Sequence, residues 1–333
     1  MEMIIKRGCD AMLKVIVVYI LAVILCVILL PAAVSRLLGR FNEGYSITNE
    51  QPARPAQPNE AEQAFQLSGI IFQYYTAYER LALFDELEEY IVMVVAAEMP
   101  ALFHIDALKA QAVAARTYAV HQLIENPGMP LYDIYQAFAT KESLRELWGD
   151  RFDYFMARIR MSVETTRGEI MMYNGVPILA VFHAMSAGQT ELAENVWRRP
   201  RPYLISVFSC DYDGINGFEV ETIIHVATVA RSLGGSENDR FVITQISNAG
   251  YVLEVTFGNQ TFTGREVRER LGLRSTNFNV THAANGDAIF ITRGHGHGVG
   301  MSQHGANNRA LRGANYIEIL THYFHNVSFG FLQ

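Results

Sequence analysis

Cysteine is scarce in this chain, with only three among 333 residues. A disulfide-dense scaffold needs several closely spaced cysteines, so that class of protein is excluded. Cys9 and Cys26 lie near the N-terminus, and only Cys210 belongs to the remainder of the chain. That remainder can therefore form neither an internal disulfide nor a metal site built from several cysteines.

An excess of basic residues is also lacking. The chain has 27 Lys and Arg against 34 Asp and Glu, which gives a formal net charge of −7. Nucleic-acid-binding proteins usually carry a basic excess, so we expect no nucleic acid partner. Hydrophobic residues make up 50% of the chain, which is too many for a disordered protein. Basic and acidic residues balance in the first 67 positions, so the negative charge belongs to the other 266.

Long apolar runs are absent except for one, Val15 to Val34, which holds 20 uncharged residues. A helix of this length spans the roughly 30 Å hydrocarbon core of a bilayer. A cleaved signal peptide would have a shorter apolar stretch, and a buried core helix is seldom apolar on all sides. Basic residues precede the run, which favours a cytoplasmic N-terminus. We predict a cytoplasmic tail (1–14), a single transmembrane anchor (15–34), an extended Pro-containing linker (35–67) and one folded domain (68–333).

The domain itself reads as α+β, with a mixed arrangement of helices and antiparallel strands around a substrate groove. Apolar periodicity predicts a helix over 81–99, which Pro100 ends, and an alanine-rich helix over 106–123 with Asp106 as its N-cap. Asn174-Gly175 predicts a hairpin. Further strands are expected at 241–247, 251–263 and 287–292. Helices are expected at 265–271, capped by Gly272, and at 315–324.

Glu98 is the first candidate for chemistry. It follows Val-Val-Ala-Ala on the apolar face at the end of the first helix. Partial desolvation favours the protonated form of a carboxyl group, which is the form that a general acid needs. Two structural explanations remain open at this point: a solvated glutamate at a helix end, or an ion pair with Arg116.

Two later stretches combine small residues with polar ones. The first runs from His183 to Trp197 and suits the rim of a ligand site, although a loop of satisfied polar residues is the alternative. The second, Arg293 to Asn307, is rich in glycine, which permits close backbone approach. It suits a wall that binds sugar or peptide, or else a metal site, since His295, His297 and His304 are all capable ligands. A purely structural glycine-rich turn is the third alternative.

Taken together, these stretches resemble the stage II sporulation protein D family. The resemblance covers roughly residues 70–330. It rests on AAEMP with the following ALKAQAVAARTYA, on the H-x-x-S-x-G-x-T-E block that ends in VW, and on GHGVGMSQHGA. The preceding membrane anchor also fits this family.

The resemblance implies a peptidoglycan lytic transglycosylase. Such an enzyme cleaves the bond between N-acetylmuramic acid and N-acetylglucosamine, leaves a 1,6-anhydro end, and acts in engulfment beside a membrane-anchored amidase. It implies that Glu98 is the catalytic acid and that the domain lies on the wall side of the cell membrane. Substrate-binding candidates are the polar residues of the three stretches: Gln111, Arg116, His183, Ser186, Thr190, His297, Ser302 and Gln303.

No metal or other cofactor is implied for this chain. Some members of the family hold zinc with two cysteines and a histidine near the second stretch, and this chain lacks that cysteine pair. His295 and His304 stand where aromatic residues are common, and Ala187 stands where a second glycine is common. Two alternative functions are a zinc-dependent cell-wall amidase or peptidase built on the histidines, and a non-catalytic peptidoglycan-binding protein.

Overall fold

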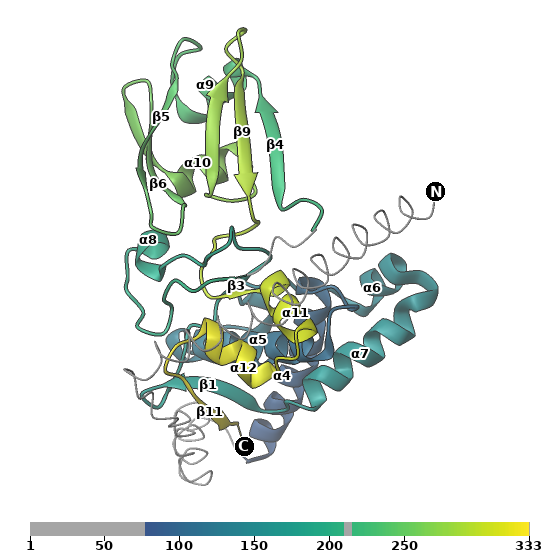
Figure 1. Ribbon diagram of the computed structural model, residues 1–333. Coiled ribbons are helices and arrows are strands. Elements are labelled where there is room, and N and C mark those ends of the chain that lie inside the picture. The colour runs from purple at the N-terminus through teal and green to yellow at the C-terminus, as the bar shows by residue number, and fades with distance from the viewer. Residues whose placement is uncertain (1–76, 210–214, 333) are drawn as a thin grey trace, which may run out of the picture. The chain divides into compact units, whose positions relative to one another are not determined.

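The computed structural model describes residues 77–209 and 215–332 (Figure 1). The expected tail (1–14), transmembrane segment (15–34) and linker (35–67), together with Cys210, lie outside the described residues. Within the two described ranges, no helix is both long enough and apolar enough to cross a bilayer.

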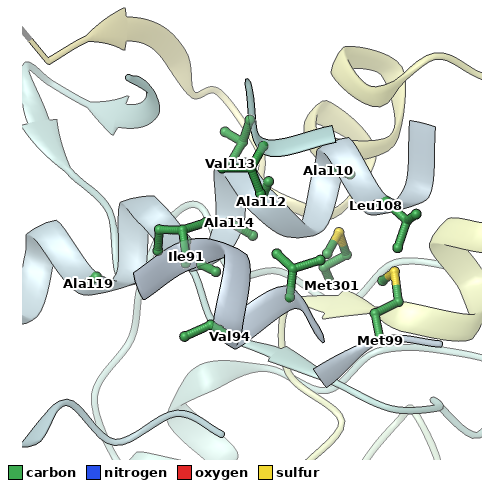
Figure 2. Packing of buried hydrophobic residues seen from close by; sticks show 14 of the residues in the cluster. Ile91, Val94, Met99, Leu108, Ala110, Ala112, Val113, Ala114, Ala119 and Met301 are labelled. Atoms are coloured by element: carbon green, nitrogen blue, oxygen red, sulfur yellow. The ribbon is translucent and has the colours of Figure 1, made fainter. Parts of the chain in front are cut away.

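Helix α5 (Ile105–Glu125) is the centre of the larger hydrophobic core. Thirteen of its 21 residues are buried, and its alanines let neighbouring elements approach closely on several sides. Helix α4 (Ala77–Glu98) packs against it, and Figure 2 shows Ile91 and Val94 of α4 beside the alanines of α5. The predicted N-cap of α5 was wrong. His104 caps the helix instead, because its Nδ1 accepts the Asp106 backbone N–H at 3.2 Å.

Elements from both ends of the described chain complete this core. Helices α6 (Lys141–Trp148) and α7 (Phe152–Glu164) come early, whereas α11 (Gln303–Leu311) and α12 (Tyr316–Tyr323) come late. A three-stranded antiparallel sheet has the order β11 (Ser328–Phe331), β1 (Glu169–Tyr173), β2 (Val176–Pro177). The predicted Asn174-Gly175 hairpin is confirmed, with φ of 51° and 78° at the two turn residues.

A second, smaller core is built from residues 224–290. One antiparallel sheet has the order β4 (Glu219–Ile224), β9 (Ala288–Arg293), β8 (Phe278–His282), and the other β5 (Phe241–Ile246), β6 (Val252–Phe257), β7 (Gln260–Thr263). Helices α9 (Val226–Leu233) and α10 (Gly264–Leu271) complete it. The region expected as a strand over 251–263 is a hairpin of β6 and β7 that turns at Gly258-Asn259, and Gly272 caps α10 as predicted.

The α+β class is confirmed, and helices and strands alternate along the chain. The β-rich segment is an insertion, because the chain returns to the first core after β9. The return is made by β10 (Met301–Ser302), which pairs in parallel with β3 (Phe182–His183). Gly300, at φ 71°, has no room for a side chain, since a Cβ would lie 2.1 Å from the Val181 carbonyl oxygen. This glycine therefore serves strand pairing rather than ligand contact.

Candidate active site

Glu98 is the last residue of α4, where the following Met99-Pro100 ends the helix. Its side chain is half-buried, and both carboxyl oxygens accept hydrogen bonds. The Ala137 backbone N–H donates to Oε1 at 2.9 Å, and the Gln303 side-chain amide donates to Oε2 at 3.3 Å. Arg116, the alternative partner considered from the sequence, pairs elsewhere. The carboxyl group is therefore held in one orientation by two donors from distant parts of the chain.

The segment 131–138 supplies the first of these donors. It begins with a 3₁₀ turn at Leu131–Asp133. Tyr90 of α4 fixes the rest of it, because its ring stacks on Phe138 at a centroid distance of 5.7 Å and its hydroxyl accepts the Gln136 amide at 3.1 Å. This segment carries no motif, so it was not predicted to belong to the site. Only the hydrogen bond from Ala137 to Glu98 identifies the segment as part of the site.

The second donor, Gln303, comes from the glycine-rich motif. The β3–β10 pairing places Ser302 opposite His183, and the Ser302 hydroxyl then caps α11 by accepting the Gly305 N–H at 3.2 Å. Gln303 is the first residue of that helix and is 4% exposed. Its amide lies between Glu98 Oε2 and Gln111 Oε1, the latter at 3.5 Å. Glu98, Gln111 and Gln303 thus lie together. Gln111, Ser302 and Gln303 are buried, in contrast to the substrate-binding role that was expected from the sequence.

A groove of about 1180 Å³ runs past Glu98 between the helical core and the β-rich insertion. Its helical side includes Tyr118, Tyr135 and Trp197 of α8 (Ala193–Trp197), and its opposite side includes Arg268 of α10. Burial lowers the pKa of the Arg268 guanidinium and raises that of the Tyr118 phenol. The polar and charged lining residues are Glu98, Tyr118, Asp133, Tyr135, Gln136, Glu191, Asn195, Arg198, Tyr251, Thr263, Arg265, Glu266, Arg268, Glu269, Thr276 and His297.

His183 and His297 form hydrogen bonds with the backbone carbonyl and the backbone N–H of the same residue, Val299. The Val299 carbonyl accepts a hydrogen bond from His183 Nδ1 at 3.0 Å, and the Val299 N–H donates to His297 Nδ1 at 3.1 Å. His183 therefore carries a proton on Nδ1, whereas the His297 ring is neutral with Nδ1 unprotonated. Desolvation lowers the pKa of His183 to about 4, and desolvation together with His183 lowers that of His297 to about 3. Only His297 also lines the groove.

The histidines do not form a cluster with metal-site geometry. Among residues 77–209 and 215–332, no group of three or more His, Cys, Asp or Glu side chains is placed to hold an ion. His297 Nδ1 is used by Val299, and the His304 ring packs edge-on against Phe103 at 5.1 Å. The donor set described here therefore does not fit a zinc site of three converging protein ligands.

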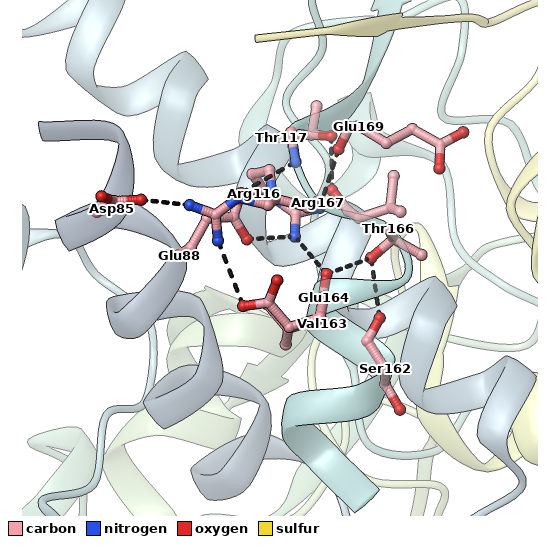
Figure 3. Close-up of polar contacts among 12 residues, drawn as sticks. Asp85, Glu88, Arg116, Thr117, Ser162, Val163, Glu164, Thr166, Arg167 and Glu169 are labelled. Atoms are coloured by element: carbon pink, nitrogen blue, oxygen red, sulfur yellow. Dashed lines mark hydrogen bonds and ion pairs between the residues drawn. The ribbon is translucent and has the colours of Figure 1, made fainter. Parts of the chain in front are cut away.

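Arg116, expected in the substrate groove, lies instead in the core with none of its surface exposed (Figure 3). Its Nε and Nη2 donate to the two oxygens of Glu88 at 2.7 and 2.8 Å, and Nη1 donates to the Glu169 carbonyl at 3.1 Å. Its guanidinium therefore has structural partners and no path to a ligand.

Thr190 and Ser186 are also fully buried. The Thr190 hydroxyl accepts the Val207 N–H at 2.9 Å and so fixes the loop that follows α8. Neither residue lines the groove, in contrast to the expectation from the sequence.

Glu191 is a second carboxylate in the groove wall, which the sequence analysis quoted in a motif but gave no role. Its side chain is 1% exposed, and Oε1 accepts the Leu192 N–H at 2.7 Å and the Asn195 amide at 2.9 Å. Oε2 has no hydrogen-bond partner within the described part of the chain. The backbone of Glu191 is itself fixed, because its N–H donates to the Gly298 carbonyl at 2.7 Å.

Comparison with known proteins agrees with the motifs. A family model described as "Stage II sporulation protein" matches residues 81–173, which contain Glu98 and α5. Stage II sporulation protein D of Bacillus subtilis (strain 168) is 34% identical over 294 residues, covering 84% of this chain and 85% of the relative. The protein of the same name from Bacillus amyloliquefaciens is 37% identical over 253 residues, covering 72% of this chain and 73% of the relative.

A more distant relative carries a different name. The "Amidase enhancer" of Bacillus subtilis (strain 168) is 25% identical over 286 residues. The match covers 68% of this chain and 38% of that protein, so the relative has a large part with no counterpart here.

Proposed function

We propose, since this chain belongs to the stage II sporulation protein D family, that it is a peptidoglycan lytic transglycosylase with Glu98 as its catalytic acid and base. The observation that carries the proposal is the position of Glu98. It lines the groove of about 1180 Å³, and two donors fix its carboxyl group. The groove exceeds the roughly 300–1,000 Å³ of a typical small-molecule site, which suits a polymer.

The proposed reaction needs one protein carboxyl group. Protonated Glu98 donates its proton to the glycosidic oxygen as the bond from C1 of N-acetylmuramic acid breaks. Positive charge develops on C1 and the ring oxygen, and the carboxylate left on Glu98 stabilises it. The C6 hydroxyl oxygen of the same muramic acid then forms a bond to C1, and its proton passes to Glu98. The products are a 1,6-anhydro end and a free N-acetylglucosamine hydroxyl, with no water consumed.

The hydrogen bonds of Glu98 suggest which oxygen carries the proton. The contact between Gln303 and Oε2 is longer than the contact between Ala137 and Oε1, at 3.3 against 2.9 Å. The weaker contact is the easier one to give up. We therefore assign the transferred proton to Oε2, with Ala137 keeping Oε1 in place throughout.

Two arginines of the groove are available to a strand that carries lactyl carboxylates, although Asp133 and Glu191 line the same groove. Glu266 is occupied with the N-terminus of α10, where it accepts the Thr263 N–H at 2.7 Å, and Glu269 pairs with Arg265 at 2.7 Å. Arg198 and Arg268 are the lining cations without an ion pair among the described residues. They offer positive charge to an acidic polymer in a domain that is negative overall.

The proposed cellular role is supported by the family and by the sequence. We propose that residues 15–34 anchor the chain in the cell membrane, with residues 68–333 on the wall side, where they remodel the septal wall during engulfment. A membrane-anchored cell-wall amidase is the proposed partner, since one relative is named an amidase enhancer.

Glu98→Gln tests the proposal. The substitution keeps the shape of the side chain but removes the transferable proton, so release of anhydro-muropeptides from purified glycan strands should fall to background in mass spectra. Glu125→Gln is the matched control, because Glu125 is also the last residue of a helix but is exposed and outside the groove. Unchanged product from Glu98→Gln would remove Glu98 from the mechanism.

The same digests separate the alternatives. A zinc-dependent amidase would release stem peptides, lose activity with a chelator and contain zinc in elemental analysis. A non-catalytic binding protein would sediment with glycan strands and release nothing. Either result would contradict the transglycosylase proposal.

A further inference from the structure

Tyr135 is the most exposed large apolar or aromatic side chain in the described part of the chain, at 95%. It lines the same groove as Glu98. The neighbouring aromatic residues make ring contacts with the protein: Tyr132 packs edge-on against Tyr90 at 5.8 Å, and Phe138 stacks on the same ring. Tyr135 makes no ring contact and no side-chain hydrogen bond within residues 77–209 and 215–332.

The backbone that carries Tyr135 is held on both sides. Ile134 before it is 4% exposed and belongs to the larger core. Gln136 after it donates to the Tyr90 hydroxyl at 3.1 Å, and its backbone N–H donates to the Ile134 carbonyl at 2.8 Å. The ring is therefore presented to the groove by a fixed segment rather than by a free loop.

The same segment also holds the catalytic candidate. Ala137, two residues after Tyr135, donates its N–H to Glu98 Oε1. Two residues of chain span at most about 7 Å, which is close to the length of one sugar unit. A sugar ring bound next to Glu98 therefore lies within reach of Tyr135.

The surroundings of Tyr135 place it over the groove and not on an outer face. Its phenol contributes to the raised pKa of Tyr118 on α5, and it also acts on the pKa of Arg268 on α10. These two residues lie on the two sides of the groove. Trp197, which packs against His297 at 5.1 Å and against the larger core, provides a second aromatic in the groove lining.

We propose that Tyr135 is a substrate-contacting residue whose ring stacks on a pyranose of the glycan strand beside the bond that Glu98 cleaves. Pyranoses with equatorial substituents present a flat face of C–H groups. That face is apolar and slightly positive, so it suits the negative face of an aromatic ring. The proposal rests on the proposed function for the identity of the strand, and it assigns Tyr135 a role in affinity and position rather than in proton transfer.

Binding to the full-length Glu98→Gln chain tests this without turnover. The probes are soluble, stem-peptide-free oligosaccharides of alternating N-acetylglucosamine and N-acetylmuramic acid, titrated by calorimetry in detergent micelles. In that background Tyr135→Ala should weaken the Kd about tenfold, which is the scale of one aromatic contact. Tyr135→Phe should stay within about twofold, because the ring and not the hydroxyl makes the contact.

Tyr154→Ala is the matched control. Tyr154 is a 58% exposed tyrosine of α7 that lies outside the groove, so its removal should leave the Kd unchanged. Circular dichroism checks that every variant is folded, which we expect since Tyr135 contributes no buried surface.

Three results would overturn the proposal. They are an unchanged Kd for Tyr135→Ala, an equal loss for Tyr135→Phe and Tyr135→Ala, and no glycan binding by the Glu98→Gln parent. Failure of the proposed reaction is recognised separately, because it appears as missing anhydro product from the wild-type chain. Glycan binding that depends on Tyr135 without such product would support the Tyr135 contact and contradict only the reaction.

Discussion

The side-chain amide of Gln303 donates to Glu98 Oε2 at 3.3 Å and so joins residues that are 205 positions apart. Gln303 begins α11 after the β-rich insertion, whereas Glu98 ends α4 before it. Since Gln303 is 4% exposed, it acts on the substrate through Glu98 and is a positioning residue.

Gln303→Ala should lower kcat about 10- to 100-fold with little change in KM. The expected loss corresponds to one hydrogen bond to a charged group, about 1.5–3 kcal/mol. Steady-state kinetics on stem-peptide-free strands measures both parameters. The matched control is Asn307→Ala on the same helix, which removes the contact of Asn307 Oδ1 with the His104 N–H at 2.8 Å but none with Glu98. A rise in KM at constant kcat would show that Gln303 binds substrate directly.

Arg116→Met should lower the free energy of unfolding by about 3–5 kcal/mol, because it leaves the buried Glu88 carboxylate without its partner. The double substitution Glu88→Met with Arg116→Met should recover most of that loss, since neither member of the pair is then left without its partner. Chemical denaturation measures both. Arg160→Met is the control, because its pair with Glu89 is exposed and should contribute no more than about 1 kcal/mol.

The role of Arg116 in the core also predicts a kinetic result. Where the double variant folds, its KM for glycan strands should equal that of the wild type. A raised KM in the folded double variant would return Arg116 to the substrate groove.

Stability should fall as the pH drops from 7 to 5. His183 is buried and neutral in the folded state, where desolvation lowers its pKa to about 4, while in the unfolded chain its pKa is about 6.5. Between these values the unfolded chain binds more protons, so stability rises with pH across this window. His183 alone should contribute about 2 kcal/mol to the difference between pH 7 and pH 5. The lowered pKa of His297 changes stability in the same direction.

Urea unfolding at the two pH values checks this. His183→Gln should reduce the difference by the stated amount, while His225→Gln should not, because the His225 side chain is 68% exposed. An identical pH dependence in wild type and His183→Gln would show that His183 does not titrate on unfolding.

Local patterns predicted much of the fold. The Asn174-Gly175 turn, the end of α4 before Pro100 and the Gly272 cap depend on a few neighbouring residues, so they could be read directly from the sequence. The N-cap of α5 was placed two residues late, because His104 was not recognised as a side chain able to cap a helix. The strands β4, β8, β10 and β11 were not predicted, and β10 has only two residues, too few to show a periodicity.

The candidate site was also predicted only in part from the sequence. Motifs in the sequence were sufficient to propose Glu98, Gln111 and Gln303, and composition alone excluded a disulfide scaffold and indicated a single apolar run at 15–34. Only the tertiary structure separated Gln303, which touches Glu98, from Arg116, which pairs with Glu88. It also introduced Ala137 and Tyr135, from a segment without a motif. The physical reason is that a side chain's partners depend on contacts across hundreds of residues, whereas sequence patterns report on neighbours a few positions away.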